Sequence, residues 1–244
     1  MRLPILPQAA VTADFTSLSR EAMSALDASL RAHEDEKWAT FYENREKPCP
    51  FFVPTPDECL VEWLTSGLTR PGRALDIGCG NARNSIYLAR QGYSVDSIDY
   101  SPSAVAWARE QVSDAGLSVN LACSSIFDWT PSPGGYDLIY DCGCFHHIAP
   151  HRREQYGALV SGALAAGGAF GLVCFKPEAG SGYSDEDVYE RRSLGGGLGY
   201  SESRLRAIWS RSLQVSVLRT MREPAPQSGL FGRAFLWALL AHRQ

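Results

Sequence analysis

Two glycines one residue apart follow a short apolar segment that contains an acid. In the stretch LDIGCGNA, Asp76 stands two positions before Gly78, and Cys79 separates Gly78 from Gly80. Glycine removes the side chains that keep a ligand away from the backbone, and it permits the positive φ of a sharp turn. A helix over residues 84–91 would offer its free N–H groups to that ligand. The stretch therefore predicts a nucleotide-cofactor loop between a strand and a helix.

The spacing separates two classes of cofactor. A dinucleotide fingerprint has a third glycine that lets the helix pack closely near a pyrophosphate. Arg83, a bulky residue, stands at that position. Asp76 instead accepts hydrogen bonds from a cationic or amine-bearing ligand rather than from a phosphate. An oxidoreductase that uses NAD or a nucleotide sugar is therefore the weaker alternative.

A second acid ends the next predicted strand. Asp99 follows Gly80 by about 20 residues, the spacing expected of a carboxylate that binds both hydroxyls of a ribose in a doubly wound sheet. Tyr100 is next to it and could lie against an adenine ring. The glycine loop and the strand-end acid, in this order, favour an adenosine-containing cofactor.

Strands and helices that alternate along the chain would position these groups. The predicted strands are residues 74–77, 94–99, 119–122, 136–141, 169–175, 213–221 and 231–242. Helices are predicted over residues 84–91, 102–115, 150–165 and 202–211. This alternation indicates a parallel sheet with helices on both faces. The fold class is therefore α/β, with a Rossmann-like core over residues 71–244.

Residues 1–70 are expected to form an N-terminal helical cap. A helix over residues 14–31 has an approximate apolar face. The charged residues 33–37 are interpreted as a solvated turn, and a second helix is predicted over residues 57–65 after a proline-rich crossing. Trp38 and Phe41 are expected to pack the cap onto the sheet rather than to bind a ligand.

Composition excludes several functions. The net charge of −4 gives no general attraction to nucleic acid, so we expect no nucleic-acid partner. No stretch approaches the roughly 20 apolar residues of a membrane span, and the N-terminus has no segment typical of a signal peptide. Seven cysteines without a paired framework favour a reducing cytoplasm. Cysteines and histidines at residues 142–151 match no standard zinc spacing, so no metal is expected.

The glycine loop resembles motif I of the class I S-adenosylmethionine-dependent methyltransferases, D-x-G-x-G-x-G. Ala82 stands where that family has its third glycine, a change that adds one methyl group. The order of motifs is similar to the bacterial small-molecule branch near the thiopurine and tellurite methyltransferases. The resemblance implies S-adenosylmethionine as cofactor and a seven-stranded, mostly parallel sheet whose last strand is antiparallel.

Position and resemblance together assign the cofactor-binding residues. Ser125 and Ile126 follow the third strand, where the family contacts adenine, and Cys142 ends the strand that meets the methionine part. Arg45 could bind the cofactor carboxylate, with Tyr42 beside it. The full predicted set is Tyr42, Arg45, Asp76, Gly78, Cys79, Gly80, Asn84, Asp99, Tyr100, Ser125, Ile126 and Cys142.

The residues that face the methyl acceptor are expected in the loop after the fourth predicted strand, residues 136–141. His146 and His147 stand in the loop that the resemblance places near the transferred methyl group, and an imidazole can take the proton of a neutral acceptor. We do not expect both rings to face the same way. A small-molecule thiol is the first candidate acceptor, because a thiol needs little help to ionise; oxygen and nitrogen acceptors, and a cofactor-binding protein without catalysis, stay open. Glycines at residues 195–199 form either a hinged loop over the acceptor or a connector. The oligomeric state stays unknown.

Overall fold

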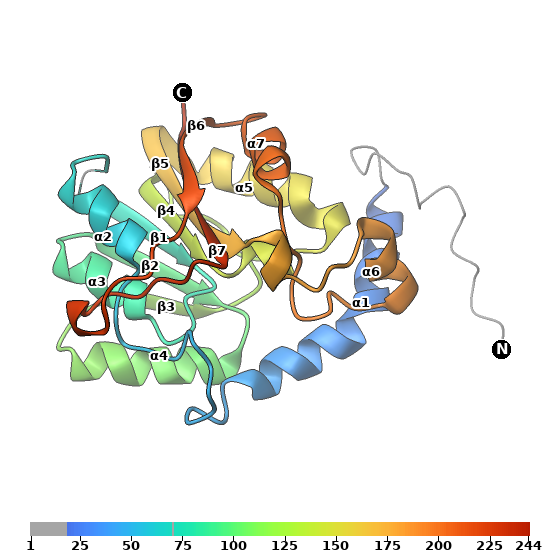
Figure 1. The fold of residues 1–244 in the computed structure, drawn as a ribbon, viewed down its shortest axis with the longest axis horizontal. Coiled ribbons are helices and arrows are strands. Elements are labelled where there is room, and N and C mark those ends of the chain that lie inside the picture. Colours follow the sequence, from blue (N-terminus) through green and yellow to red (C-terminus); the bar gives the residue numbers. More distant parts are fainter. Residues whose placement is uncertain (1–18, 70) are drawn as a thin grey trace.

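A seven-stranded sheet forms the centre of the protein in the computed structural model, which describes residues 19–69 and 71–244 (Figure 1). The order across the sheet is β3-β2-β1-β4-β5-β7-β6. The strands are β1 (Arg73–Ile77), β2 (Ser94–Asp99), β3 (Asn120–Cys123), β4 (Tyr136–Cys142), β5 (Leu164–Phe175), β6 (Gln214–Thr220) and β7 (Leu236–His242).

Strand directions confirm the predicted sheet. β3, β2, β1, β4 and β5 all run in the same direction, each parallel to the next. β7 runs antiparallel to both β5 and β6, between which it lies. The last strand is therefore antiparallel, as expected, and the carboxyl ends of β1 to β5 meet at one edge of the sheet.

Seven α-helices accompany the sheet within the described residues. They are α1 (Arg20–Phe41), α2 (Glu58–Thr65), α3 (Arg83–Arg90), α4 (Pro102–Asp114), α5 (Arg153–Ala163), α6 (Asp185–Arg191) and α7 (Glu202–Trp209). The predicted helix over residues 150–165 was too long, because a 3₁₀ turn (Pro150–Arg152) precedes α5 and the chain already enters β5 at Leu164. None of the described helices has the length and apolar character needed to cross a membrane.

The first helix differs from the prediction at both ends. Ser19 caps α1, because its side chain accepts a hydrogen bond from the Ala22 N–H at 3.2 Å. The helix continues through residues 33–37 to Phe41, so the interpretation of that charged stretch as a turn was wrong. Residues 20–41 contain neither glycine nor proline, and Ala, Glu and Lys favour helix. Residues 14–18 of the predicted helix lie outside the described part of the chain.

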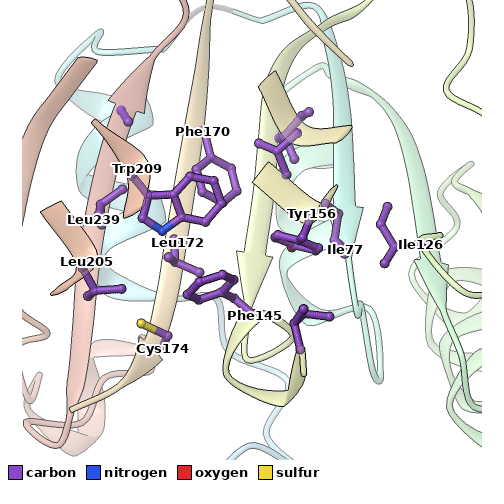
Figure 2. Close-up of a cluster of buried hydrophobic side chains, with 14 of the residues drawn as sticks. Ile77, Ile126, Phe145, Tyr156, Phe170, Leu172, Cys174, Leu205, Trp209 and Leu239 are labelled. Atoms are coloured by element: carbon purple, nitrogen blue, oxygen red, sulfur yellow. The ribbon is translucent and has the colours of Figure 1, made fainter. Parts of the chain in front are cut away.

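Alternate side chains of the central strands enter two separate apolar clusters. On β5, Phe170 and Leu172 join one cluster, whereas Val173 joins the other. Successive strand residues point to opposite faces, so each face carries its own core. The first cluster is drawn in Figure 2, where Trp209 of α7 lies against Phe170 with ring centroids 4.4 Å apart. Helices α5 and α7 cover this face, and α2 and α3 cover the other.

The N-terminal helices pack in two different places. α1 contacts both α4 and α6, and Figure 1 shows α6 beside it. Leu60 and Trp63 of α2 are buried in the sheet's own core beside Leu138. The predicted division at residue 70 into cap and core stays a prediction, and α2 contributes to the core from the cap side of that boundary.

Candidate active site

A cavity of about 510 Å³ opens at the carboxyl edge of the parallel strands. Open α/β sheets bind their ligands at this edge. The lining comes from α1, from the ends of β1, β2, β4 and β5, and from the loops after the strands. It includes Trp38, Phe41, Phe175, Gly196 and nine of the predicted site residues, namely Tyr42, Gly78, Asp99, Tyr100, Ser125, Ile126, Cys142, His146 and His147.

The glycine loop comes close to its neighbours where the sequence removes side chains. Gly78 and Gly80 have φ of 67° and 55°. A Cβ on Gly78 would lie 2.8 Å from the Cys144 Cβ, and one on Gly80 would lie 3.1 Å from the Tyr42 hydroxyl. Ala82 also has a positive φ, 62°, so the methyl group at the third glycine position is held in a strained backbone.

Asp99 stands between the glycine loop and the cavity. Its carboxylate accepts hydrogen bonds from the Gly80 N–H at 2.9 Å and the Ser101 N–H at 2.8 Å. A carboxylate has about four acceptor positions, so Asp99 keeps acceptor capacity for the hydroxyls of a ribose. Burial raises the pKa of Asp99, whose residue is only 8% exposed. Tyr100 is half exposed at the same rim.

Asp76 is buried, with 2% of its surface exposed. Its Oδ2 accepts a hydrogen bond from the Ser85 hydroxyl at 2.5 Å, and Ser85 in turn accepts one from Ser97. Desolvation raises the pKa of Asp76 to about 7. Asp76 lines a second, smaller cavity of about 50 Å³ that adjoins the first, together with Cys79, Gly80, Asn81, Arg83 and Asn84. Predicted cofactor residues therefore surround both spaces.

Arg45 lies away from both cavities. Its guanidinium forms a bidentate pair with Glu110 of α4, at 2.5 and 3.1 Å, and lies over the Trp107 ring. Neither cavity lining includes Arg45. Tyr42, in contrast, lines both cavities, and burial raises its pKa well above the usual value. The structure thus separates two residues that the sequence placed side by side at the cofactor.

His146 and His147 both line the large cavity, contrary to our expectation that they could not face the same way. They form a 3₁₀ turn with Phe145, whose ring is buried among Tyr156, Tyr200 and Trp209. The His146 ring stacks on Phe175, with centroids 3.8 Å apart. The Nδ1 atom of each histidine is buried without a hydrogen-bond partner among the described residues. Both nitrogens are enclosed by the protein, so the histidine rings meet the cavity through other atoms.

A buried carboxylate holds this histidine turn. Asp141 accepts hydrogen bonds from the N–H groups of Cys144 and Phe145 and from the Tyr156 hydroxyl. Desolvation raises the pKa of Asp141 to about 7. We predicted no role for Asp141 beyond the end of its strand, yet this acid positions the turn that carries the two histidines.

Burial lowers the pKa of His146 to about 3 and that of His147 well below its usual value. The folded protein keeps His146 neutral at pH values at which the unfolded chain protonates it, so this group removes stability as the pH falls below about 6.5. The limiting slope is about 1.4 kcal/mol per pH unit.

A His146→Gln variant is expected to lose less stability than the wild type between about pH 7 and about pH 5. Urea unfolding of both proteins at the two pH values measures this difference. Asp76 and Asp141 titrate in both proteins, so their contributions cancel. Equal losses in the two proteins would contradict the neutral, buried state of His146.

Aromatic side chains from the cap form part of the cavity wall. Trp38 and Phe41, which we expected only to pack the cap onto the sheet, both line the large cavity. The Trp38 ring meets the His147 ring edge to face at 4.7 Å. Among residues 19–69 and 71–244, no group of three or more His, Cys, Asp or Glu residues is arranged to hold a metal ion.

Arg83 is a site residue that the sequence analysis missed. We considered it only as a bulky replacement of a glycine, but its side chain is 6% exposed and lines the smaller cavity. The guanidinium pairs with Asp57 at 2.5 Å and donates to the Thr55 carbonyl at 2.9 Å. The sequence feature that could have indicated this role is a cation in the first turn of the helix that follows the glycine loop.

The strand order, the glycine loop and the cavity at the strand ends define an α/β protein of the doubly wound, ligand-binding class. Comparison with known proteins gives the family. The sequence profile of a methyltransferase domain matches residues 74–168. An uncharacterised methyltransferase of Schizosaccharomyces pombe is 32% identical over 120 residues, which are 49% of this chain and 83% of that protein.

Two further proteins are similar over different lengths. The 2-heptyl-1-hydroxyquinolin-4(1H)-one methyltransferase of Mycobacteroides abscessus is 28% identical over 131 residues, 53% of this chain and 57% of that enzyme. This chain thus spans little more than half of that relative. The Burkholderia thailandensis 1,6-didemethyltoxoflavin-N1-methyltransferase has the same fold, with a TM-score of 0.62, 18% identity and coverage of 94% and 92% of the two chains.

This chain belongs to the class I S-adenosylmethionine-dependent methyltransferases. Its cofactor is therefore S-adenosylmethionine, and the residues present fit that molecule. The two bare glycines leave room beside the backbone, and the Asp99 oxygens are placed for ribose hydroxyls. Family membership rules out the oxidoreductase alternative.

Proposed function

We propose that this protein transfers a methyl group from S-adenosylmethionine to a small aromatic molecule, with an aromatic thiol as the first candidate. The observation that carries the proposal is the aromatic character of the large cavity. The rings that line it include those of Trp38, Phe41, Phe51, Phe127, Phe175, His146 and His147. Such a lining favours a flat apolar acceptor with one or two polar groups.

The cofactor supplies an electrophilic methyl group on a sulfonium. The chain's own task is to hold the acceptor in line with that methyl group and to exclude water. The acceptor sulfur forms a bond to the methyl carbon while the carbon–sulfonium bond breaks, and the acceptor's proton must leave. With their pKa values lowered by burial, His146 and His147 are weak bases. An acceptor that ionises by itself therefore suits this site better than one that needs a strong base.

Relatives support a small aromatic acceptor. The Mycobacteroides relative is named for a hydroxyquinolinone, and the Burkholderia structure contains bound 1,6-didemethyltoxoflavin with S-adenosylhomocysteine. We keep oxygen and nitrogen acceptors as alternatives. The free state of all seven cysteines agrees with action in a reducing compartment such as the cytoplasm, which we also propose. A nucleic-acid partner is not part of the proposal.

We expect S-adenosylhomocysteine to bind in calorimetry and quinoline-4-thiol to be methylated. The matched panel replaces the thiol of this acceptor by a hydroxyl or an amine on the same ring, and mass spectrometry measures the methylated product. If the hydroxyl or the amine compound is methylated faster than the thiol, the acceptor is an oxygen or a nitrogen atom and not a sulfur atom. Cofactor binding without any product from a wide panel would favour a cofactor-binding protein without catalysis. Lack of S-adenosylhomocysteine binding would reject the whole proposal.

A further inference from the structure

The smaller cavity lies beside the glycine loop and the end of β4. Its lining combines aromatic rings from the segment after α1 with polar residues from the loop and from the start of α3, namely Tyr42, Phe51, Phe52, Asp76, Gly78, Cys79, Gly80, Asn81, Arg83, Asn84 and Cys142. Tyr42, Phe51, Gly78 and Cys142 also line the large cavity, so the two spaces adjoin. A cofactor with its ribose at Asp99 and its sulfur near Gly78 would extend its methionine part toward this smaller space.

Arg83 presents hydrogen-bond donors at this cavity. One terminal nitrogen donates to the Thr55 carbonyl and pairs with Asp57, and the other donates to the Cys142 Sγ at 3.2 Å. For the Nε–H we find no hydrogen-bond partner among the described residues. A guanidinium has five N–H donors in a planar fork, so Arg83 keeps donors for a further acceptor.

The neighbours of Arg83 hold it in one place. Asp57 accepts hydrogen bonds from the Tyr140 hydroxyl at 2.6 Å and from the Asn84 amide at 3.1 Å, in addition to its pair with Arg83. The Asn84 amide oxygen accepts the Asp57 N–H at 3.0 Å. These contacts share the negative charge of Asp57 among several donors. The guanidinium is therefore oriented before any ligand arrives, which reduces the entropy lost on binding.

Charge in the two linings limits the alternatives. Among the described residues that line the two cavities, Lys and Arg occur only as Lys37 and Arg83. Lys37 lies over Trp38 on the acceptor side, whereas Arg83 is beside the glycine loop. Arg45 is outside both cavities and is already paired with Glu110. Asp76 lines the same small cavity as Arg83, where its carboxyl oxygens can accept hydrogen bonds from an ammonium.

We propose that Arg83, not Arg45, binds the carboxylate of the methionine part of S-adenosylmethionine. This inference rests on the proposed function, because it assumes that the cofactor occupies the cavities described above. It adds Arg83 to the cofactor-binding residues and gives a function to the cation three positions after Gly80. The carboxylate would meet the free edge of a guanidinium that Asp57 holds from the other side.

Calorimetry with two ligands tests this assignment. S-adenosylhomocysteine carries the carboxylate, and S-adenosyl-3-thiopropylamine is the same molecule without it. We expect the wild type to bind S-adenosylhomocysteine about 10- to 100-fold more tightly than the decarboxylated analogue, the range of a hydrogen bond to a charged group. In Arg83→Gln this ratio should fall close to one, through loss of affinity for S-adenosylhomocysteine alone. Arg90→Gln, an exposed arginine on the same helix, is the matched control and should keep the wild-type ratio.

Each other result overturns the inference. Equal wild-type affinities for the two ligands would mean that no residue holds the carboxylate. Equal weakening of both ligands in Arg83→Gln would give Arg83 only a role in the shape of the loop. Loss of the ratio in Arg45→Gln would return the assignment to Arg45. Failure of the wild type to bind either ligand would reject the proposed function itself.

Arg83→Gln leaves Asp57 buried without its ion-pair partner, which can prevent folding. The double variant Asp57→Asn/Arg83→Gln removes both charges and keeps the amide hydrogen bonds. It should fold and should show the same ratio close to one. A wild-type ratio in this folded variant would overturn the inference.

Discussion

An Asp99→Ala variant is expected to bind S-adenosylhomocysteine about 100-fold or more weakly than the wild type, because two hydrogen bonds to a charged group are lost. Asp99 also accepts the N–H groups of Gly80 and Ser101. The substitution therefore removes the ribose contacts and loosens the glycine loop at the same time. Isothermal calorimetry measures the affinity, and thermal unfolding reports any change in stability.

Two further variants separate these effects. Asp99→Asn keeps the shape of the side chain and one oxygen, so it should weaken binding less than Asp99→Ala does. Asp114→Ala, at the exposed end of α4, should leave the affinity unchanged. If Asp99→Ala folds and binds S-adenosylhomocysteine as the wild type does, the ribose site lies elsewhere.

The meeting of Gly78, Asp99 and Cys142 at one cavity was predictable because it depends on position along the strands. β1, β2 and β4 pair in parallel, with Ile77 beside both Ile98 and Asp141. Residues that end these strands must therefore meet at one edge. The local pattern of the sequence locates each strand end, so Gly78, Asp99 and Cys142 could be brought together without a structure.

Contacts of long side chains were not predictable in the same way. Arg45 finds Glu110, which stands 65 positions later in the chain, and no local pattern identifies that partner. Arg83 is the converse case, because its partner Asp57 comes from a segment interpreted only as the start of a helix. The direction of a flexible arginine depends on which acid the fold brings near it. The sequence alone therefore could not show that Arg83 lines a cavity and that Arg45 lies outside both.

The aromatic wall of the large cavity was not predicted, for a different reason. The sequence does not distinguish an aromatic side chain that fills a core from one that lines a cavity, and this applies to Trp38, Phe41, His146 and His147. The cavity exists because α1 continues to Phe41 and lies across the strand ends, and that length depended on the charged stretch that we interpreted as a turn. The predicted helix ended at residue 31 and α1 ends at Phe41, and this difference of ten residues hid an aromatic wall.

A Gly197→Ala variant is expected to lower kcat/KM for the acceptor by about 10- to 100-fold, because a displacement of about 1 Å at a reacting group costs this much. A Cβ on Gly197 would lie 2.9 Å from the His146 Cδ2, 3.0 Å from the Phe175 Cε2 and 3.1 Å from the His147 Cε1. The histidine turn cannot move freely away, since the Leu198 N–H donates to the His146 carbonyl at 2.8 Å. The rings that form the acceptor wall must therefore shift.

Gly196→Ala is the comparison that isolates this contact. Both glycines have positive φ, 100° at Gly196 and 126° at Gly197, so either substitution strains the backbone by about 1–3 kcal/mol. A Cβ on Gly196 meets no atom within 4 Å. Gly197→Ala should therefore reduce acceptor turnover more than Gly196→Ala does, while both keep S-adenosylhomocysteine affinity within about two-fold of the wild type. Equal losses of turnover in the two variants would assign the effect to backbone strain, and the histidine turn would then not form the wall against which the acceptor is held.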